Sequence, residues 1–248
     1  MCGRFFQDLE ENEVRAHFDV PPGEAQEPLP LPSRYNVGPG QHIWVVRHHP
    51  QKHARSLDAL HWGLIPHFAK DRKGAFRLIN ARAETLDRAP TFRVAFAKRR
   101  CLVAARGFYE WQARGKHKQP FAIAPDDGGL LAFAGIWENW KDPATGEWVR
   151  SVAIVTTDAA PGLDALHHRM PVIVAPCDHA RWLGEAPADA DALKALLRPY
   201  AEPLRVWPVS TRVNRAAVDG PENLAPVALA AAEQAPEGDA GGAAERRR

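Results

Sequence analysis

Residues 130–137 read LLAFAGIW, an apolar run that no charged residue interrupts. An apolar run of this length, without alternation, is typical of a strand covered on both faces. Similar short runs precede and follow it, at 101–105 (CLVAA), 121–124 (FAIA), 152–156 (VAIVT) and 171–175 (PVIVA). Together these segments predict a central β-sheet.

The segments outside this centre predict further strands and several helices. Two more strands are expected at 42–47 and 57–62, after a loop at 21–40 that contains six prolines and three glycines. Cap-like residues and apolar spacing predict helices at 9–18, at 91–98 after the cap Thr91, at 178–183 and at 188–197. A helical stretch is also expected after Asn80, interrupted by Pro90.

Strands and helices do not alternate regularly, which argues against a doubly wound fold. We therefore predict an α+β protein, a single domain with a mixed or antiparallel, barrel-like central sheet flanked by helices. The domain is expected to span residues 1–228. Residues 229–248 are expected to be a disordered tail, because AAEQAPEGDAGGAAERRR, from 231 onward, lacks aromatic and β-branched residues.

Composition limits the classes of protein to consider. The three cysteines have no paired spacing, which favours a reducing compartment, and the acidic start lacks the apolar segment of a signal peptide. No apolar run approaches the roughly 20 residues of a membrane span. We expect a cytoplasmic protein that needs no membrane, associated with the nucleoid when bound to DNA, and a monomer.

Common cofactor and metal motifs are missing from the sequence. It contains no GxxxxGK[ST], GxGxxG, GxSxG or HExxH motif, and the cysteines lie too far apart for a CxxC zinc site. The 11 histidines show no ligand spacing with a carboxylate or thiolate. We therefore expect neither a metal nor a cofactor.

Positive charge is concentrated in one part of the chain. Residues 67–118 contain 14 Lys and Arg against 4 Asp and Glu, whereas residues 1–66 contain 6 against 8. Such a segment suits a polyanionic partner, although a solvated surface also accounts for it.

Cys2 has reactive chemistry if Met1 is removed, which a small second residue usually permits. An N-terminal cysteine carries an α-amine with a pKa near ~7.7–8.0 and a thiol near ~8.5. The amine forms an imine with an aldehyde, and the thiol then closes a five-membered thiazolidine ring. An amide carbonyl is the other target, and a small buried cysteine without function is the plain alternative.

Five motifs make the sequence resemble a known family. MCGRF at 1–5, WGLIP at 62–66, NARAET at 80–85, RRCLVAARGFYEW at 99–111 and HHRMPVIV at 167–174 are similar to those of the SRAP (SOS response-associated peptidase) family, in the same order. The resemblance spans roughly residues 1–215.

The resemblance implies covalent capture of abasic sites in single-stranded DNA, a thiazolidine DNA–protein crosslink in the DNA damage response. Cys2 would be the nucleophile, and Asn80 would orient its amine or the sugar. Glu110 would shuttle protons during Met1 removal and imine formation. His167 would act on the opened deoxyribose, with His168 as the alternative if HHRMP is read one residue later.

Burial among Phe108, Tyr109 and Trp111 should raise the pKa of Glu110, which suits a proton shuttle. Arg106 stands where the family usually has Asp, and a positive charge near Glu110 would lower that pKa. A salt bridge for Glu110, a core position for His167 and a turn position for Asn80 are the structural alternatives.

Contacts with DNA need cations for phosphates and aromatic faces for bases. Arg4 and Arg82 would clamp phosphates, Pro39 in YNVGPG would wedge against bases, and three aromatic residues in or beside the basic segment are stacking candidates, namely Trp62, Phe68 and Trp111. Strand cleavage as a lyase can accompany the same imine. Two other functions stay open: a cysteine peptidase acting on proteins through Cys2, His167 and Glu110, and a non-covalent single-strand-binding module.

Overall fold

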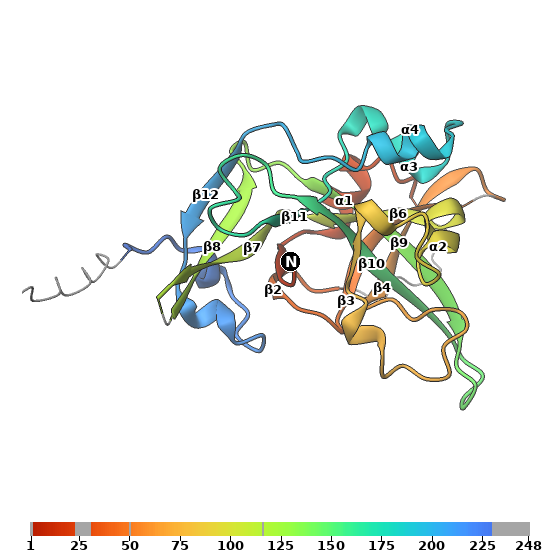
Figure 1. The fold of residues 1–248 in the computed structure, drawn as a ribbon, viewed down its shortest axis with the longest axis horizontal. Coiled ribbons are helices and arrows are strands. Elements are labelled where there is room, and N and C mark those ends of the chain that lie inside the picture. The colour runs from red at the N-terminus through yellow and green to blue at the C-terminus, as the bar shows by residue number, and fades with distance from the viewer. Residues whose placement is uncertain (1, 23–30, 50, 116, 230–248) are drawn as a thin grey trace, which may run out of the picture.

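The computed structural model describes residues 2–22, 31–49, 51–115 and 117–229 (Figure 1). Two sheets dominate the described chain, and short helices lie on the outside of the larger one.

The larger sheet closes into a five-stranded barrel. Its strands follow one another in the order β10, β4, β3, β6 and β9, and β9 pairs with β10 to complete the ring. The β4–β10 pair is parallel and the other four pairs are antiparallel. The bounds are β3 His42–His49, β4 Ala54–Trp62, β6 Arg100–Ala105, β9 Leu131–Lys141 and β10 Trp148–Asp158.

Two three-residue strands extend β10 beyond the barrel. β5 (Asn80–Arg82) runs parallel to β10, and β11 (Arg169–Pro171) runs antiparallel to its last residues. β10 therefore receives β4 and then β5 along one edge and β11 on the opposite edge, since Thr156 pairs with both Arg82 and Pro171. This pairing brings three distant parts of the sequence together.

The second sheet is antiparallel and open. Its order is β12-β8-β7-β1-β2, and its strands are β1 Phe5–Gln7, β2 Arg34–Val37, β7 Gly107–Arg114, β8 His117–Pro125 and β12 Leu204–Pro208. Figure 1 shows this sheet on one side of the molecule and the barrel on the other, with the start of the chain between them.

Helices are short throughout the described residues. The α-helices are α1 Glu11–His17, α2 Arg93–Lys98, α3 His179–Leu183 and α4 Ala190–Ala195. The 3-10 turns are η1 Ala75–Arg77, η2 Ala83–Thr85, η3 Pro176–Asp178, η4 Thr211–Asn214 and η5 Pro221–Leu224.

Alternate residues of the barrel strands enter two different apolar clusters, as the two-residue period of a strand requires. One cluster joins Trp44 to Phe96 and Trp182 from the helices. The other joins barrel residues to the second sheet, and there the Phe5 ring packs edge-on against Trp62 at 5.1 Å and Phe133 at 6.0 Å. The second cluster therefore holds the two sheets together around the chain start.

The predicted fold class is confirmed, including the barrel-like mixed sheet. Three local predictions were wrong. The strand expected at 171–175 is instead β11 at Arg169–Pro171, and Ile173 forms only an isolated bridge with Phe133. Residues 80–85 form β5 and η2 instead of a helix, because β10 offers an open edge to Asn80–Arg82. Part of the expected 21–40 loop is β2, which pairs with β1. The predicted disorder of the tail falls on residues 230–248, outside the described residues.

Candidate functional site

Cys2 lies in the apolar cluster between the two sheets and is completely buried. Its position follows from β1, which begins three residues later and pairs with β7 through Phe5 and Phe108. Burial, followed by the negative charge of Glu110, raises the pKa of the Cys2 thiol. In this chain Met1 precedes Cys2, so the Cys2 nitrogen is part of a peptide bond.

Asn80 binds the backbone of Cys2 directly. Its Nδ2 donates a hydrogen bond of 2.9 Å to the Cys2 carbonyl oxygen. The parallel pairing of Asn80 with Ile154 fixes it on the edge of β10. Its Oδ1 is buried and accepts no hydrogen bond from the described residues. The predicted proximity of Asn80 and Cys2 is therefore seen, and an acceptor remains for a further group.

Glu110 is the carboxylic acid of this site. It lies on β7 opposite Phe121, and only 4% of its surface is exposed. Burial raises the pKa of Glu110 to about 7, as expected from its aromatic neighbours. A carboxyl with such a pKa can both donate and accept a proton near neutral pH.

Arg106 does not oppose this shift, so the expectation that it lowers the pKa of Glu110 was wrong. Its guanidinium donates to Glu13 Oε1 at 2.7 Å and to the Gly128 carbonyl at 2.9 Å. The charge of Arg106 is therefore committed to α1, and burial determines the pKa of Glu110.

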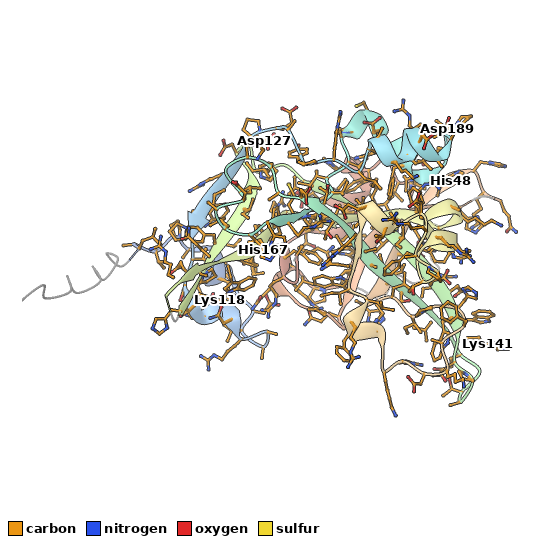
Figure 2. All side chains as sticks on the ribbon, viewed as in Figure 1. His48, Lys118, Asp127, Lys141, His167 and Asp189 are labelled. Atoms are coloured by element: carbon orange, nitrogen blue, oxygen red, sulfur yellow. The ribbon has the colours of Figure 1, made fainter. Side chains whose placement is uncertain are left out.

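His167 lies in the loop between β10 and β11, and Figure 2 shows it in the region between the two sheets. Leu163 and Leu166 of the same loop pack on the cluster that contains Cys2. The backbone N–H of Arg169 donates to His167 Nδ1 at 3.0 Å, so the neutral ring carries its proton on Nε2. Burial lowers the pKa of His167, which favours this neutral form. His168 is exposed and stacks on His167 with ring centroids 4.3 Å apart.

Arg169 links two of the sequence motifs, and the sequence analysis gave it no role. Its buried guanidinium donates to both Glu84 oxygens, at 2.6 and 3.1 Å, to Asp158 at 2.8 Å and to the Thr156 carbonyl at 2.6 Å. The Arg of HHRMP is thus bound to the Glu of NARAET. Each motif contains one of these opposite charges, but only the pairing of β5 and β11 with β10 shows that they meet.

The predicted DNA-binding residues differ in their exposure. Arg82 and Pro39 are exposed, and Phe68 is 60% exposed. Arg4 is partly buried and donates to Asn36 Oδ1 at 2.7 Å and to the Val213 carbonyl at 2.8 Å, so it is largely engaged within the protein. Trp111 is partly exposed and donates to Asn214 Oδ1 at 2.7 Å.

Trp62 does not fit its predicted stacking role. It is completely buried, its Nε1 donates to the Ile79 carbonyl at 3.0 Å, and its ring packs on Phe5. A base cannot reach either face of this indole, so Trp62 is a core residue.

Neither a metal cluster nor a membrane span is found in the part of the chain that the structure describes. No three His, Cys, Asp or Glu side chains gather there closely enough to hold a metal ion. No helix there is long and apolar enough to cross a bilayer.

The fold and the Cys2–Asn80–Glu110 arrangement define a class of protein that comparison with known sequences identifies. The chain belongs to the family described as SOS response associated peptidase (SRAP), whose sequence profile matches residues 1–216.

Particular relatives are similar over most of their length. The chain is 37% identical over 228 residues to abasic site processing protein YoqW of Bacillus subtilis, covering 90% of this chain and 98% of the relative. It is 35% identical to abasic site processing protein HMCES of Gallus gallus, covering 79% of this chain and 66% of the relative. A crystal structure of a Bacteroides thetaiotaomicron protein shares the fold, with a TM-score of 0.82 at 24% identity over 92% of this chain and all of that one.

Proposed function

We propose that this protein processes abasic sites in DNA by capturing them covalently through Cys2. Its family and the names of its relatives support this role. One observation carries the proposal. Cys2 lies close to the buried carboxyl of Glu110, whose pKa is near neutral, and Asn80 donates a hydrogen bond to the Cys2 backbone.

The chemistry begins after Met1 has been removed, when the Cys2 nitrogen is a free α-amine. The amine adds to the aldehyde carbon of the ring-opened abasic site, and Glu110 returns a proton to the hydroxyl that leaves as water. The Cys2 sulfur then adds to the imine carbon, and the thiol proton moves to the nitrogen. The product is a thiazolidine, formed intramolecularly at a high effective concentration.

Single-stranded DNA is the proposed substrate, because an aldehyde must reach a buried cysteine without a second strand in the way. His167 would act on the opened sugar through Nε2–H, and Arg82, Pro39 and Phe68 would contact the flanking strand. An imine that is not closed by sulfur can undergo β-elimination, which would give strand cleavage.

A cysteine peptidase acting on other proteins is less well supported. Such an enzyme needs the thiolate, and burial together with the charge of Glu110 raises the pKa of the Cys2 thiol. Removal of Met1 from its own chain requires only one turnover, with Glu110 moving the proton.

The test mixes the processed protein with a single strand that carries one abasic site, followed by a denaturing gel. Wild type and Cys177→Ala, which changes an exposed cysteine, should give a heat-stable shifted band. Cys2→Ala and an undamaged strand should give none. If the wild type, with Met1 shown to be absent by mass spectrometry, gives no shifted band, the proposal is wrong.

A further inference from the structure

Residues 63–79, between β4 and β5, form an arm that is pinned along one face of β9. Glu138 accepts from the backbone N–H and the Nδ1 of His67 at 3.1 and 2.9 Å. Trp140 donates to the Ala69 carbonyl at 2.7 Å, and Asp142 binds Arg72 at 2.8 Å. Glu138 and Trp140 are two residues apart on β9, so they share one face of the strand, and Asp142 directly follows the strand. Figure 1 shows the arm beside the far end of the β9–β10 hairpin.

The return half of the arm is equally well anchored. Ala75 is buried in a cluster with Ile65 and Trp140, and the Leu78 carbonyl accepts from the Leu64 N–H at 3.1 Å. Gly63, at φ +133°, is needed here, because a Cβ would lie 2.9 Å from the Ala75 carbonyl oxygen. The arm is therefore held at both ends and along its length.

This anchored arm turns two aromatic rings toward solvent. Phe68 is 60% exposed and Phe76 is 63% exposed. A ring so exposed contributes little to the core, since the apolar area it removes from water is small. Phe76 immediately follows Ala75, and because Ala75 is packed in the interior, the backbone at Phe76 holds the ring on the solvent side.

Unpaired positive charge accompanies the rings. Lys70, Lys73 and Arg77 take part in no ion pair within the described residues, whereas Arg72 is paired with Asp142. The Arg77 guanidinium lies 5.4 Å from the centre of the Phe76 ring. Aromatic faces beside unpaired cations match a polyanion with stackable bases, which is the chemistry of a single nucleic-acid strand.

The arm leads directly into the candidate site. Phe76 precedes Asn80 by four residues, and four residues of extended chain span at most about 14 Å. Stacked nucleotides advance about 3.4 Å each along a strand. A base on Phe76 would therefore lie within about four stacked nucleotides of the position held by Asn80.

We propose that Phe76, with Arg77 beside it, is a second nucleic-acid contact that stacks an unpaired base of the strand flanking the captured site. This inference rests on the proposed function only for the position of the lesion. The recognition is of a π face and phosphates, so it does not depend on base identity.

The test measures non-covalent binding to a single strand carrying a tetrahydrofuran abasic analogue, which has no aldehyde and cannot crosslink. Phe76→Ala and Phe76→Leu should weaken binding by about 5- to 100-fold, because one stacked base is lost. Phe76→Trp should bind like the wild type. Val206→Ala, at an exposed apolar position on β12, serves as the control that should change nothing.

A second series shortens the strand from either end. When only one nucleotide remains on each side of the analogue, Phe76→Ala and wild type should bind equally, because the base that Phe76 contacts is gone. Equal binding of Phe76→Ala, Phe76→Leu and wild type on the long strand would overturn the inference. So would a loss that is the same on long and short strands.

Crosslinking to a true abasic strand is scored separately and decides the proposed function. If the wild type fails to crosslink while Phe76→Ala still loses affinity in a length-dependent way, the capture proposal fails and the second contact stands. If crosslinking is intact and the Phe76 variants bind like the wild type, the capture proposal stands and the second contact fails.

Discussion

Glu110 is the residue on which the proposed chemistry most depends, because burial raises the pKa of its carboxyl to about 7. Forming an imine requires one group that takes a proton from the amine and gives one to the departing hydroxyl. An ordinary exposed glutamate would be ionised and unable to donate at neutral pH. The environment of β7 thus turns a common side chain into a proton carrier.

Glu110→Gln tests this role through the pH dependence of crosslinking. The wild-type rate should be highest between about pH 7, the pKa of Glu110, and about pH 8, where the amine is neutral. The variant should react about 100-fold more slowly, without the inflection near pH 7, because an amide carries no transferable proton. An unchanged profile, measured on processed protein by gel, would exclude Glu110 as the proton carrier.

Asn80→Asp tests the contact with the Cys2 backbone. The substitution keeps the size of the side chain but replaces the donor at 2.9 Å from the Cys2 carbonyl with an acceptor. We expect the crosslinking rate to fall by about tenfold or more, as one hydrogen bond is exchanged for repulsion. A wild-type rate in the variant would show that the contact has no part in the reaction.

At the scale of elements, β10 organises the site. It holds β5, with Asn80, on one edge and β11, which follows His167, on the other, and Arg169 ties the two together through Glu84 and Asp158. Since the Arg169 N–H also binds His167 Nδ1, the same residue fixes the ring's tautomer and its place. Two strands of three residues could not be held so firmly by their ladders alone.

Arg169→Lys should therefore impair both stability and chemistry. Lysine cannot replace the forked contacts, and the loss should cost roughly 2 kcal/mol of unfolding free energy and slow crosslinking. The matched control is Arg181→Lys, since Arg181 forms an exposed pair with Asp178 within one helical turn. Denaturant titration measures the unfolding free energy of both variants, and equal losses in Arg169→Lys and Arg181→Lys would contradict the account.

His179 predicts how stability depends on pH. It is buried beside Phe18, its Nε2 lies 3.2 Å from the Val174 carbonyl, and burial lowers its pKa to about 4. Between pH 6.5 and 4 the unfolded chain binds the proton and the folded one does not, so stability falls as pH falls. The loss should reach about 3 kcal/mol by pH 4.

His179→Phe removes the titrating group and should flatten this part of the curve. Calorimetry or urea unfolding at several pH values measures the slope. A slope as steep in the variant as in the wild type would assign the effect to other groups.

The elements also show what the sequence could and could not predict. The apolar strands β6, β8, β9 and β10 were recognisable, because burial on both faces leaves a continuous apolar run. β5 was mistaken for helix, since NARAET has helical propensity and only the open edge of β10 makes it a strand. β1, β2, β7 and β12 were not predicted. β1, β2 and β12 are short and pair with partners distant in the sequence, and the apolar start of β7 is interrupted by the polar residues Glu110 and Gln112.

The site residues divide in the same way. Cys2, Asn80 and Glu110 followed from family motifs, and the structure brings them together. For the expected DNA contacts, burial in the fold was decisive. Trp62 lies in the core, Arg4 is hydrogen-bonded within the protein, and Phe76, which the sequence did not single out, is exposed. Exposure depends on the packing of remote elements, and a single sequence does not encode it locally.

At the scale of the whole molecule, the site exists because two sheets pack against each other around the chain start. Within the second sheet, Gly107, at the beginning of β7, lets β7 lie close to the side chains and backbone of its neighbours β1 and β8. A Cβ there would lie 2.2 Å from Phe6 Cζ and 2.3 Å from the Ile123 carbonyl oxygen. Backbone cannot yield to such a contact without moving β7 away from β8.

Gly107→Ala should therefore lower the unfolding free energy by roughly 3 kcal/mol or more. Gly74→Ala is the control, since no atom lies within 4 Å of a Cβ built there and its backbone is α-helical. Thermal unfolding of both variants compares them, and a wild-type melting temperature for Gly107→Ala would contradict the packing described here.

The central claim is that both the nitrogen and the sulfur of Cys2 bond to one aldehyde carbon. The most direct measurement digests the crosslink made with an abasic strand, treats it with iodoacetamide and identifies the N-terminal peptide by mass spectrometry. We predict that this peptide begins at Cys2, carries the sugar aldehyde with loss of one water, and takes up no iodoacetamide. A peptide whose Cys2 thiol is alkylated, or an adduct on another residue, would contradict the account.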